Sequence, residues 1–377
     1  MVRQQARQPV RVRASDRSDP WIAGLTLLFI AAGVLFVFDT TYFYSQTHFD
    51  DGYWMITKHA VSIVLGGLLL FGLSRCRSHQ LERYARPAFI VAVLFLVIPL
   101  VPGVGHCSKG ACRWVSLGPL NIQPAETVKI AFVLYAAAWL TGKGVEVRNW
   151  RHGFAPILGL MGVVAVLLLA QPDLGTVALI GLLGVSIMFL AGVPLYQLAM
   201  LGVPVALGGY YLVAKVPWRL ARIMCFTDAW ADPSGACYQL VQSYRTFGSG
   251  GIEGIGVGAS LQKTGWLPEA HTDFILAVIG EEAGLLGAVL VLLAFMVLVY
   301  RGFRVAHRHP HTFGQLLAAG ITLIIAYQVL VNMGVVLGLL PTKGLVLPFM
   351  SYGGSAMLMA MASMGILMSL SRELRER

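Results

Sequence analysis

Residues 154–192 read FAPILGLMGVVAVLLLAQPDLGTVALIGLLGVSIMFLAG, with Asp173 as their one charged side chain. On either side of Gln171-Pro172-Asp173-Leu174, the stretch is apolar over roughly the 20 residues that cross the hydrocarbon core of a bilayer. Those four residues are too few for a domain and are typical of a tight turn at a membrane face. The stretch therefore predicts two consecutive membrane-spanning helices.

The chain as a whole is also rich in apolar residues and poor in charged ones. Of its 377 residues, 57% are hydrophobic and only 12% are charged. Soluble domains carry about 25% charged residues, so a soluble enzyme and a disordered scaffold are both excluded. The sequence contains no Walker loop and no dinucleotide fingerprint, which argues against ATP-driven transport by this chain alone.

The apolar runs predict an all-α integral membrane protein. A span needs about 20 mostly apolar residues, and scanning for such runs gives ten transmembrane helices. We expect them near 21–40, 55–73, 87–102, 123–141, 154–170, 174–192, 196–215, 273–299, 313–339 and 353–371.

The basic residues predict the orientation. Short cytoplasmic loops are enriched in Lys and Arg, and 18 of the 28 such residues fall in the N-terminus and in 74–86, 142–152, 301–311 and 372–377. The opposite short loops hold Lys58, Lys109, Arg113 and Lys343. Both termini are therefore expected to be cytoplasmic, with one large extracytoplasmic loop between the seventh and eighth spans. The net charge of +10 then reflects topology and does not indicate nucleic-acid binding.

The same model divides the chain into three parts. Residues 1–20 would be a cytoplasmic basic tail, 21–372 a transmembrane domain with its extracytoplasmic loop at about 216–272, and 373–377 a cytoplasmic end.

Four of the five cysteines fall on the outer side, which permits disulfides. Cys107, Cys112, Cys225 and Cys237 allow three pairings. We favour Cys107–Cys112 and Cys225–Cys237 because each closes a local loop, while four free thiols remain an alternative.

Charged residues within spans are costly and are candidates for function. Glu126 and Lys129 are three residues apart on one helical face and could pair, as a structural or a functional ion pair. Glu281 and Glu282 lie about 12 Å below Asp273 along the eighth span. At least one must face the bundle interior, and we expect both to serve in helix packing or hydrogen bonding.

The long outer loop holds further polar residues. Arg219 and Arg222 lie about one helical turn apart and could clamp a phosphate or a pyrophosphate. Interfacial snorkelling beside Trp218 would explain them equally well. The glycine-rich stretch 248–258 permits positive φ and close approach of backbones.

The loop ends at Asp273, just before the eighth span. A carboxylate there, next to His271, is well placed to accept a proton from a hydroxyl group. The alternative is a helix N-cap, for which Asp is a preferred residue.

The last outer segment, 340–355, contains two prolines around an apolar stretch and resembles a re-entrant or lid segment. Lys343 adds a cation to the outer face. Ser351, Tyr352 and Ser355 offer hydroxyl groups at a helix start, where backbone N–H groups are also available.

Six motifs occur in order along nearly the whole chain: Arg113-Trp114, Gln123 to Glu126 with Lys129, Gln171 to Thr176, Asp232-Pro233 with Tyr238-Gln239, Pro268 to Asp273 with Glu281-Glu282, and Pro341 to Ser355. Together they resemble the SEDS family (shape, elongation, division and sporulation), the bacterial peptidoglycan glycosyltransferases FtsW and RodA. The string Pro341-Thr342-Lys343-Gly344 is more similar to FtsW, the division member.

The resemblance implies polymerisation of lipid II at the outer face of the bacterial cytoplasmic (inner) membrane, with inversion, for septal cell-wall synthesis. It makes Asp273 the essential carboxylate, and its position suits a general base. Cations would stabilise the leaving pyrophosphate: Arg219, Arg222, Lys129, Lys343 and Arg113. The expected supporting residues are Gln123, Glu126, His271, Glu281, Glu282, Ser351, Tyr352 and Ser355.

The sequence requires no cofactor, although a divalent cation (Mg²⁺ or Mn²⁺) could bridge Asp273 and the pyrophosphate. The expected ligands are lipid II and undecaprenyl-pyrophosphate-linked glycan. By resemblance, the expected partners are a class B penicillin-binding protein transpeptidase and other division or elongation membrane proteins.

Three other functions remain. One is a lipid II flippase or secondary transporter, which would need an ionisable path near the membrane midplane. The others are the RodA-type elongation polymerase and a structural scaffold for division proteins, which would leave Asp273 and the arginines unexplained.

Overall fold

The computed structural model describes residues 18–374, apart from 109 and 119. The arginines of the basic tail, Lys109 and residues 375–377 lie outside the described residues.

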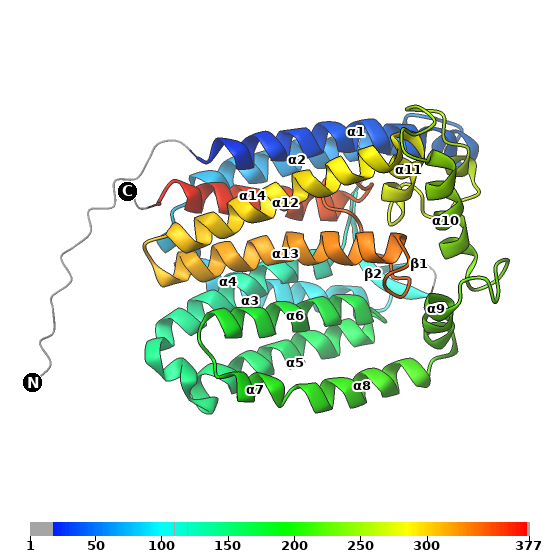
Figure 1. Ribbon diagram of the computed structural model, residues 1–377. Coiled ribbons are helices and arrows are strands. Elements are labelled where there is room, and N and C mark those ends of the chain that lie inside the picture. The colour runs from blue at the N-terminus through cyan, green and yellow to red at the C-terminus, as the bar shows by residue number, and fades with distance from the viewer. Residues whose placement is uncertain (1–17, 109, 119, 375–377) are drawn as a thin grey trace, which may run out of the picture.

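The structure is a bundle of helices that run mostly in parallel or antiparallel directions (Figure 1). The helices are α1 (Pro20–Phe49), α2 (Trp54–Arg75), α3 (Ser78–Val97), α4 (Pro124–Lys143), α5 (Ala155–Ala170), α6 (Leu174–Leu190), α7 (Leu195–Ala199), α8 (Gly202–Ala214), α9 (Pro217–Thr227), α10 (Tyr238–Gly250), α11 (Ile275–Glu282), α12 (Gly284–Arg308), α13 (Thr312–Val336) and α14 (Gly354–Ser371). Short 3₁₀ or π turns occur at Ile98–Leu100, Gly144–Arg148, Trp150–Phe154 and Gln262–Thr264.

Nine helical segments in the described part of the chain are long and apolar enough to cross a membrane. Helix α6, with 17 residues, is a shorter apolar helix. The chain is therefore a multi-pass membrane protein, as predicted, and each of the ten predicted spans has a helical counterpart. That all ten cross the membrane remains a prediction.

Local sequence signals begin several of these helices. Asp19 caps α1 by accepting a hydrogen bond from the Trp21 N–H, 2.9 Å, and Pro20 occupies the first turn. Asp173 caps α6 through the Thr176 N–H, 3.2 Å. These are the usual N-terminal devices of helices, because they satisfy otherwise unpaired N–H groups.

The core lies around α13 and α14. Inside the protein, 78% of the apolar window of α13 and 83% of that of α14 are buried. Helix α14 packs on α2, and α13 packs on α4 and α12. By contrast, only 6% of the window covering α7 and α8 is buried, so this segment faces its surroundings rather than the bundle.

The two ends of the bundle differ (Figure 1). One end holds the start of α1 and the end of α14, where Arg301 pairs with Asp19 at 2.6 Å. At the same end, the Ser78 N–H donates to the Glu373 carboxylate, 2.9 Å. The opposite end holds α9, α10, α11 and a small sheet. The long loop between α8 and α11 therefore lies at the end away from the start of α1 and the end of α14.

A small sheet accompanies the helices, which make up most of the structure as predicted. Strands β1 (Gly105–Ser108), β2 (Ala111–Leu117) and β3 (Leu120–Ile122) form an antiparallel sheet in the order β1-β2-β3. The paired backbone groups are satisfied within the segment, and strands this short give almost no periodic signal in a sequence.

The predicted eighth span, 273–299, is broken. It consists of α11 and α12, separated at Ala283, and it extends to Arg308. Gly284 has a φ of +69°, which favours glycine. The glycine-rich loop pairs with the break, because the Ile255 N–H donates to the Glu281 carbonyl, 3.0 Å, and the Leu285 N–H donates to the Gly251 carbonyl, 2.9 Å.

The apolar segment after α13 packs deep into the bundle against α1. The Phe349 ring stacks 6.1 Å from the Phe29 ring, measured between centroids. At Gly33 the backbones come so close that a Cβ atom would lie 2.1 Å from the Phe349 carbonyl oxygen. A side chain at position 33 would therefore push the segment away from α1.

We predict that Gly33→Ala destabilises the protein by about 1–3 kcal/mol, the usual cost of overpacking. Gly24→Ala is the matched control, because a Cβ at Gly24 in the same helix would meet nothing within 4 Å. Thermal unfolding in detergent checks this. Equal melting temperatures for the two variants would contradict the close approach.

Candidate outer-face site

Asp273 lies against the backbone of the segment that follows α13. A Cβ atom added to Gly344 would be 2.7 Å from the Asp273 Oδ2 atom. The cap residue of α11 is Phe274, so Asp273 precedes the cap position and the N-cap alternative does not hold. Asp273 also has other interactions within the protein.

Asn332 of α13 holds these two segments together. Its side-chain N–H₂ donates to the Asp273 carbonyl, 2.8 Å, and to the Leu345 carbonyl, 2.5 Å. Asn332 is buried. Asn332 was not among the sequence candidates, although it is one of three amides in the apolar run 313–339, with Gln315 and Gln328, and such intramembrane residues often mark function.

Lys343 lies across the first turn of α6. Its Cε atom would be 1.4 Å from a Cβ atom at Gly175, so only glycine leaves room for the ammonium group there. Burial lowers the pKa of Lys343 to about 8, with Lys129 and Arg113 lowering it further and Asp173 and Asp273 opposing them. Lys343 is thus within electrostatic reach of both acids.

Two arginines approach the same region from different elements. Arg113 of β2 donates from Nε to the Gln171 carbonyl, 2.9 Å, and from Nη2 to the Pro172 carbonyl, 2.5 Å. Arg222 of α9 donates to the Thr342 carbonyl, 3.4 Å. Burial lowers the pKa of Arg222, the Asp273 carboxylate raises it and Arg113 lowers it, so all three charges are neighbours.

Arg219 points elsewhere. Its Nη1 donates to the Leu212 carbonyl in α8, 2.9 Å. Both Arg219 and Arg222 lie beside the Trp218 ring, with the guanidinium carbons 5.0 and 5.2 Å from its centroid. The two arginines therefore do not form the predicted clamp in this structure, because α9 directs them to different carbonyl groups.

Glu126 and Lys129 of α4 form a buried ion pair at 2.7 Å. The direction of this contact does not meet hydrogen-bond geometry, so it is an ion pair only. The pair lines a small cavity with Gln328 and Ser363. Lys129 still influences Lys343 electrostatically, which places it beneath the outer cluster.

The predicted supporting residues surround this region. The Tyr352 N–H donates to the His271 carbonyl, 2.8 Å, and the two rings meet edge to face at 5.9 Å. The Gln123 N–H donates to the Ser355 Oγ atom, 3.1 Å, and the Leu347 N–H donates to the Ser351 Oγ atom, 2.9 Å. The two serine hydroxyls thus hold the backbone of the site.

A buried charge cluster fixes the outer loop that precedes Asp273. The Lys263 ammonium contacts Asp39 of α1 at 2.5 Å and Glu282 of α11 at 2.8 Å. Glu281 accepts hydrogen bonds from the Ser249 and Ser260 hydroxyls. Sequence reasoning missed Asp39 and Lys263, which are 224 residues apart and meet only through tertiary structure.

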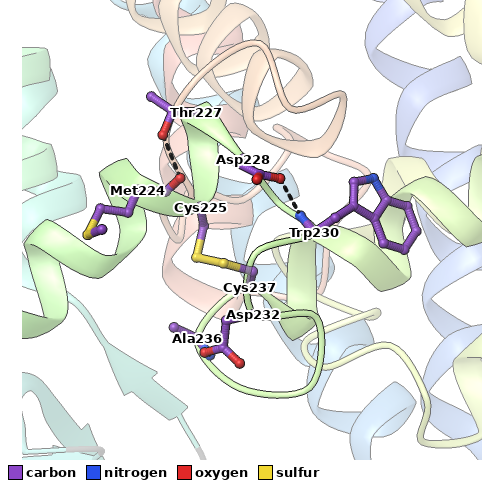
Figure 2. The surroundings of a disulfide bond; sticks show 8 residues. All are labelled: Met224, Cys225, Thr227, Asp228, Trp230, Asp232, Ala236 and Cys237. Atoms are coloured by element: carbon purple, nitrogen blue, oxygen red, sulfur yellow. Dashed lines mark hydrogen bonds between the residues drawn. A yellow bond between two sulfur atoms is a disulfide. The ribbon is translucent and has the colours of Figure 1, made fainter.

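Both favoured disulfides, Cys107–Cys112 and Cys225–Cys237, are formed in the structure. The first lies in the hairpin of β1 and β2, next to Arg113. The second joins the end of α9 to the start of α10 (Figure 2).

The outer cluster therefore combines one carboxylate, Asp273, with three cations, Arg113, Arg222 and Lys343. Such a set can bind a dianionic group and accept a proton beside it. Within the described residues, no three His, Cys, Asp or Glu side chains form a group that could hold a metal ion.

Comparison with known proteins gives a consistent result. Residues 20–376 match the FtsW/RodA/SpoVE family, described as cell cycle protein. A probable peptidoglycan glycosyltransferase FtsW of Geobacter metallireducens is 38% identical, over 97% of this chain and 98% of the relative. Stage V sporulation protein E of Bacillus subtilis is 35% identical over 92% of this chain and 95% of the relative.

Solved structures have the same fold. A chain from a structure titled "Structural coordination of polymerization and crosslinking by a peptidoglycan synthase complex" superposes with a TM-score of 0.78. It is 29% identical and covers 94% of this chain and 98% of its own. The rod shape determining protein RodA of Thermus thermophilus gives a TM-score of 0.70 at 28% identity, over 96% of this chain and 98% of its own.

We predict that Lys263→Met destabilises the protein by about 3 kcal/mol, because it leaves the buried Glu282 and the partly buried Asp39 without their cation. The side chain of Lys263 is 9% exposed and that of Glu282 is 0% exposed. Lys215→Met, at an exposed lysine of the same end, is the control. Thermal unfolding compares the two variants. An unchanged midpoint in Lys263→Met would rule out a stabilising role for the contacts of Lys263 with Asp39 and Glu282.

Proposed function

The chain belongs to the FtsW/RodA/SpoVE family of cell cycle proteins, and from this membership we propose how its outer cluster works. It is a peptidoglycan glycosyltransferase of the FtsW type, with 38% identity to an FtsW against 28% to a solved RodA. We propose that it polymerises lipid II with inversion, using Asp273 as the general base. Support comes from the meeting of Asp273 with three cations at one end of the bundle.

In this reaction Asp273 accepts the proton of the acceptor sugar hydroxyl. The hydroxyl oxygen then forms a bond to the anomeric carbon of the donor, while the bond from that carbon to the pyrophosphate oxygen breaks. One displacement inverts the anomeric centre, so no covalent enzyme intermediate is required. The carboxylate needs a fixed position for this, and the Asn332 hydrogen bond to the Asp273 carbonyl supports it.

The cations act on the leaving group. Negative charge grows on the pyrophosphate oxygen as its bond to the sugar breaks, and preorganised cations stabilise that charge. We assign this role to Arg222 and Lys343, which interact electrostatically with Asp273, and to Arg113, which interacts with both of these cations. Lys129 acts from beneath, through its effect on Lys343, and Arg219 holds α9 against α8.

The sidedness of the reaction follows from the topology proposed from the sequence. With ten spans and both termini cytoplasmic, the outer cluster lies on the extracytoplasmic face of the bacterial inner membrane. The donor would be lipid II and the released carrier undecaprenyl pyrophosphate. A class B penicillin-binding protein would crosslink the product, in line with the synthase complex that contains a similar chain.

A transporter is the second candidate, and the buried pair Glu126–Lys129 beside a small cavity favours it. A transport path needs ionisable groups near the midplane that can change partners. The other charged candidates lie at the outer end. We therefore prefer the polymerase.

Asp273→Asn keeps the shape of the side chain but removes the base. We expect it to lower lipid II polymerisation by about 100-fold or more, the contribution of a general base. Glu253→Gln, at an exposed position of the same loop, serves as the control. Polymer is measured from labelled lipid II in liposomes, with and without the partner transpeptidase. Wild-type polymer yield from Asp273→Asn would refute the mechanism, and lipid II translocation without polymer would favour the transporter.

The lowered pKa of Lys343 predicts a pH dependence. With a pKa of about 8 the ammonium is present at pH 7 and mostly lost at pH 9, so kcat/KM should fall about tenfold over that range. Lys343→Arg should make kcat/KM nearly constant between pH 7 and pH 9, because arginine stays charged. The same fall in both proteins would exclude Lys343 as its cause.

A further inference from the structure

Helix α9 carries Arg222 to the site but is barely held by protein packing. Within residues 201–227, all of which the structure describes, Cys225 is the one buried side chain. The large apolar side chains of α9, such as Trp218 and Met224, are exposed. An exposed apolar face can rest on lipid at many positions, so it does not fix where the helix lies.

Helix α10, by contrast, is anchored to the core. Leu240 and Val241 are buried in a small cluster with Ala229 of the preceding loop, and α10 packs on α11. The Ser243 hydroxyl donates to the Val336 carbonyl at the end of α13, 2.7 Å. The Gln239 amide donates to the Pro268 carbonyl, 3.3 Å, on the segment that leads to Asp273. Helix α10 therefore has a defined position relative to the site.

The disulfide Cys225–Cys237 joins these two helices, and both of its residues are buried (Figure 2). The loop between them is shaped by its own hydrogen bonds. The Trp230 N–H donates to the Asp228 carboxylate, 3.0 Å, and the Ala236 N–H donates to the Asp232 carboxylate, 2.8 Å. The covalent bond thus ties α9 to an anchored element through a structured loop.

Arg222 precedes Cys225 by three residues, about one helical turn. The disulfide at Cys225 therefore also fixes the position of the Arg222 backbone. The contact of Arg222 with the Thr342 carbonyl, 3.4 Å, is long for a hydrogen bond and weak on its own. Apart from the disulfide, α9 is held by the Arg219 hydrogen bond to the poorly buried α8 and by the burial of Ala229 in the loop that follows. The disulfide is the covalent tie that keeps this cation beside Asp273.

We propose that the Cys225–Cys237 disulfide is a positioning element of the glycosyltransferase site, which holds Arg222 where the leaving pyrophosphate develops its charge. This inference rests on the proposed function. Its consequence is that polymerisation depends on the redox state of the outer face. A dithiol such as dithiothreitol transfers two electrons and two protons to the disulfide, yielding two cysteine thiols and the cyclic oxidised dithiol.

The test is a double-mutant cycle on kcat/KM for lipid II polymerisation. It compares the wild type, Cys225→Ser with Cys237→Ser, Arg222→Ala, and the combination of all three changes. Removing the disulfide should lower kcat/KM by about 10- to 100-fold, the scale of a hydrogen bond to a charged group. In the Arg222→Ala background it should lower kcat/KM no further.

A second measurement covers the case in which the serine variants fold poorly. In a Cys107→Ser, Cys112→Ser background only the Cys225–Cys237 bond remains among the four outer cysteines. Dithiothreitol added to this folded protein should reduce activity reversibly, and the same treatment should leave its Arg222→Ala derivative at its already lowered activity.

Two outcomes overturn the inference alone: full activity without the disulfide, or an equal fold-loss in both Arg222 backgrounds, which would mean a general effect on folding. If Arg222→Ala itself is fully active, the inference and the role of Arg222 both fail. The polymerase assignment is judged separately by Asp273→Asn.

Discussion

The buried amide of Asn332 is the interaction on which the outer site depends. It donates to one carbonyl just before α11 and to another in the segment after α13, so two distant parts of the chain meet at a fixed distance. A buried carbonyl without a donor is costly, and Asn332 is itself buried, so each partner stabilises the other. Because α13 is among the most buried helices, the position of Asp273 is set by the core rather than by the exposed surface of the loop.

Two glycines contribute to this arrangement because they have no side chain. Gly175 leaves room for the Lys343 side chain on the first turn of α6, and Gly344 leaves room for the Asp273 carboxylate. A methyl group at either position would displace the charged group that lies there. These contacts explain in physical terms why glycines accompany the charged residues in the two motifs.

Much of the fold could be predicted from sequence, because long apolar runs leave few alternatives in a bilayer. The break at Gly284 could not, since it depends on a loop some 30 residues earlier that pairs with the exposed backbone groups. The short strands around Arg113 gave no periodic signal. The favoured disulfides were predictable because each closes a local loop.

The site was only partly predictable for a related reason. Asp273 and Lys343 stood out as charges beside apolar runs. The pairing of Asp39 with Lys263 did not, because nothing local links two residues that far apart. The spacing of Arg219 and Arg222 did not predict their hydrogen-bond partners. One helical turn places both side chains on one face, but Arg219 donates to the Leu212 carbonyl and Arg222 to the Thr342 carbonyl.

The break between α11 and α12 also bears on how the protein is made. At that point the glycine-rich loop, which precedes α11 in the chain, forms the hydrogen bonds that the broken helix cannot form within itself. A helix with an open break would carry unsatisfied polar groups into lipid. During synthesis the order of the chain brings the loop out of the ribosome before α12, so the partner of these backbone groups has already been made when the helix forms.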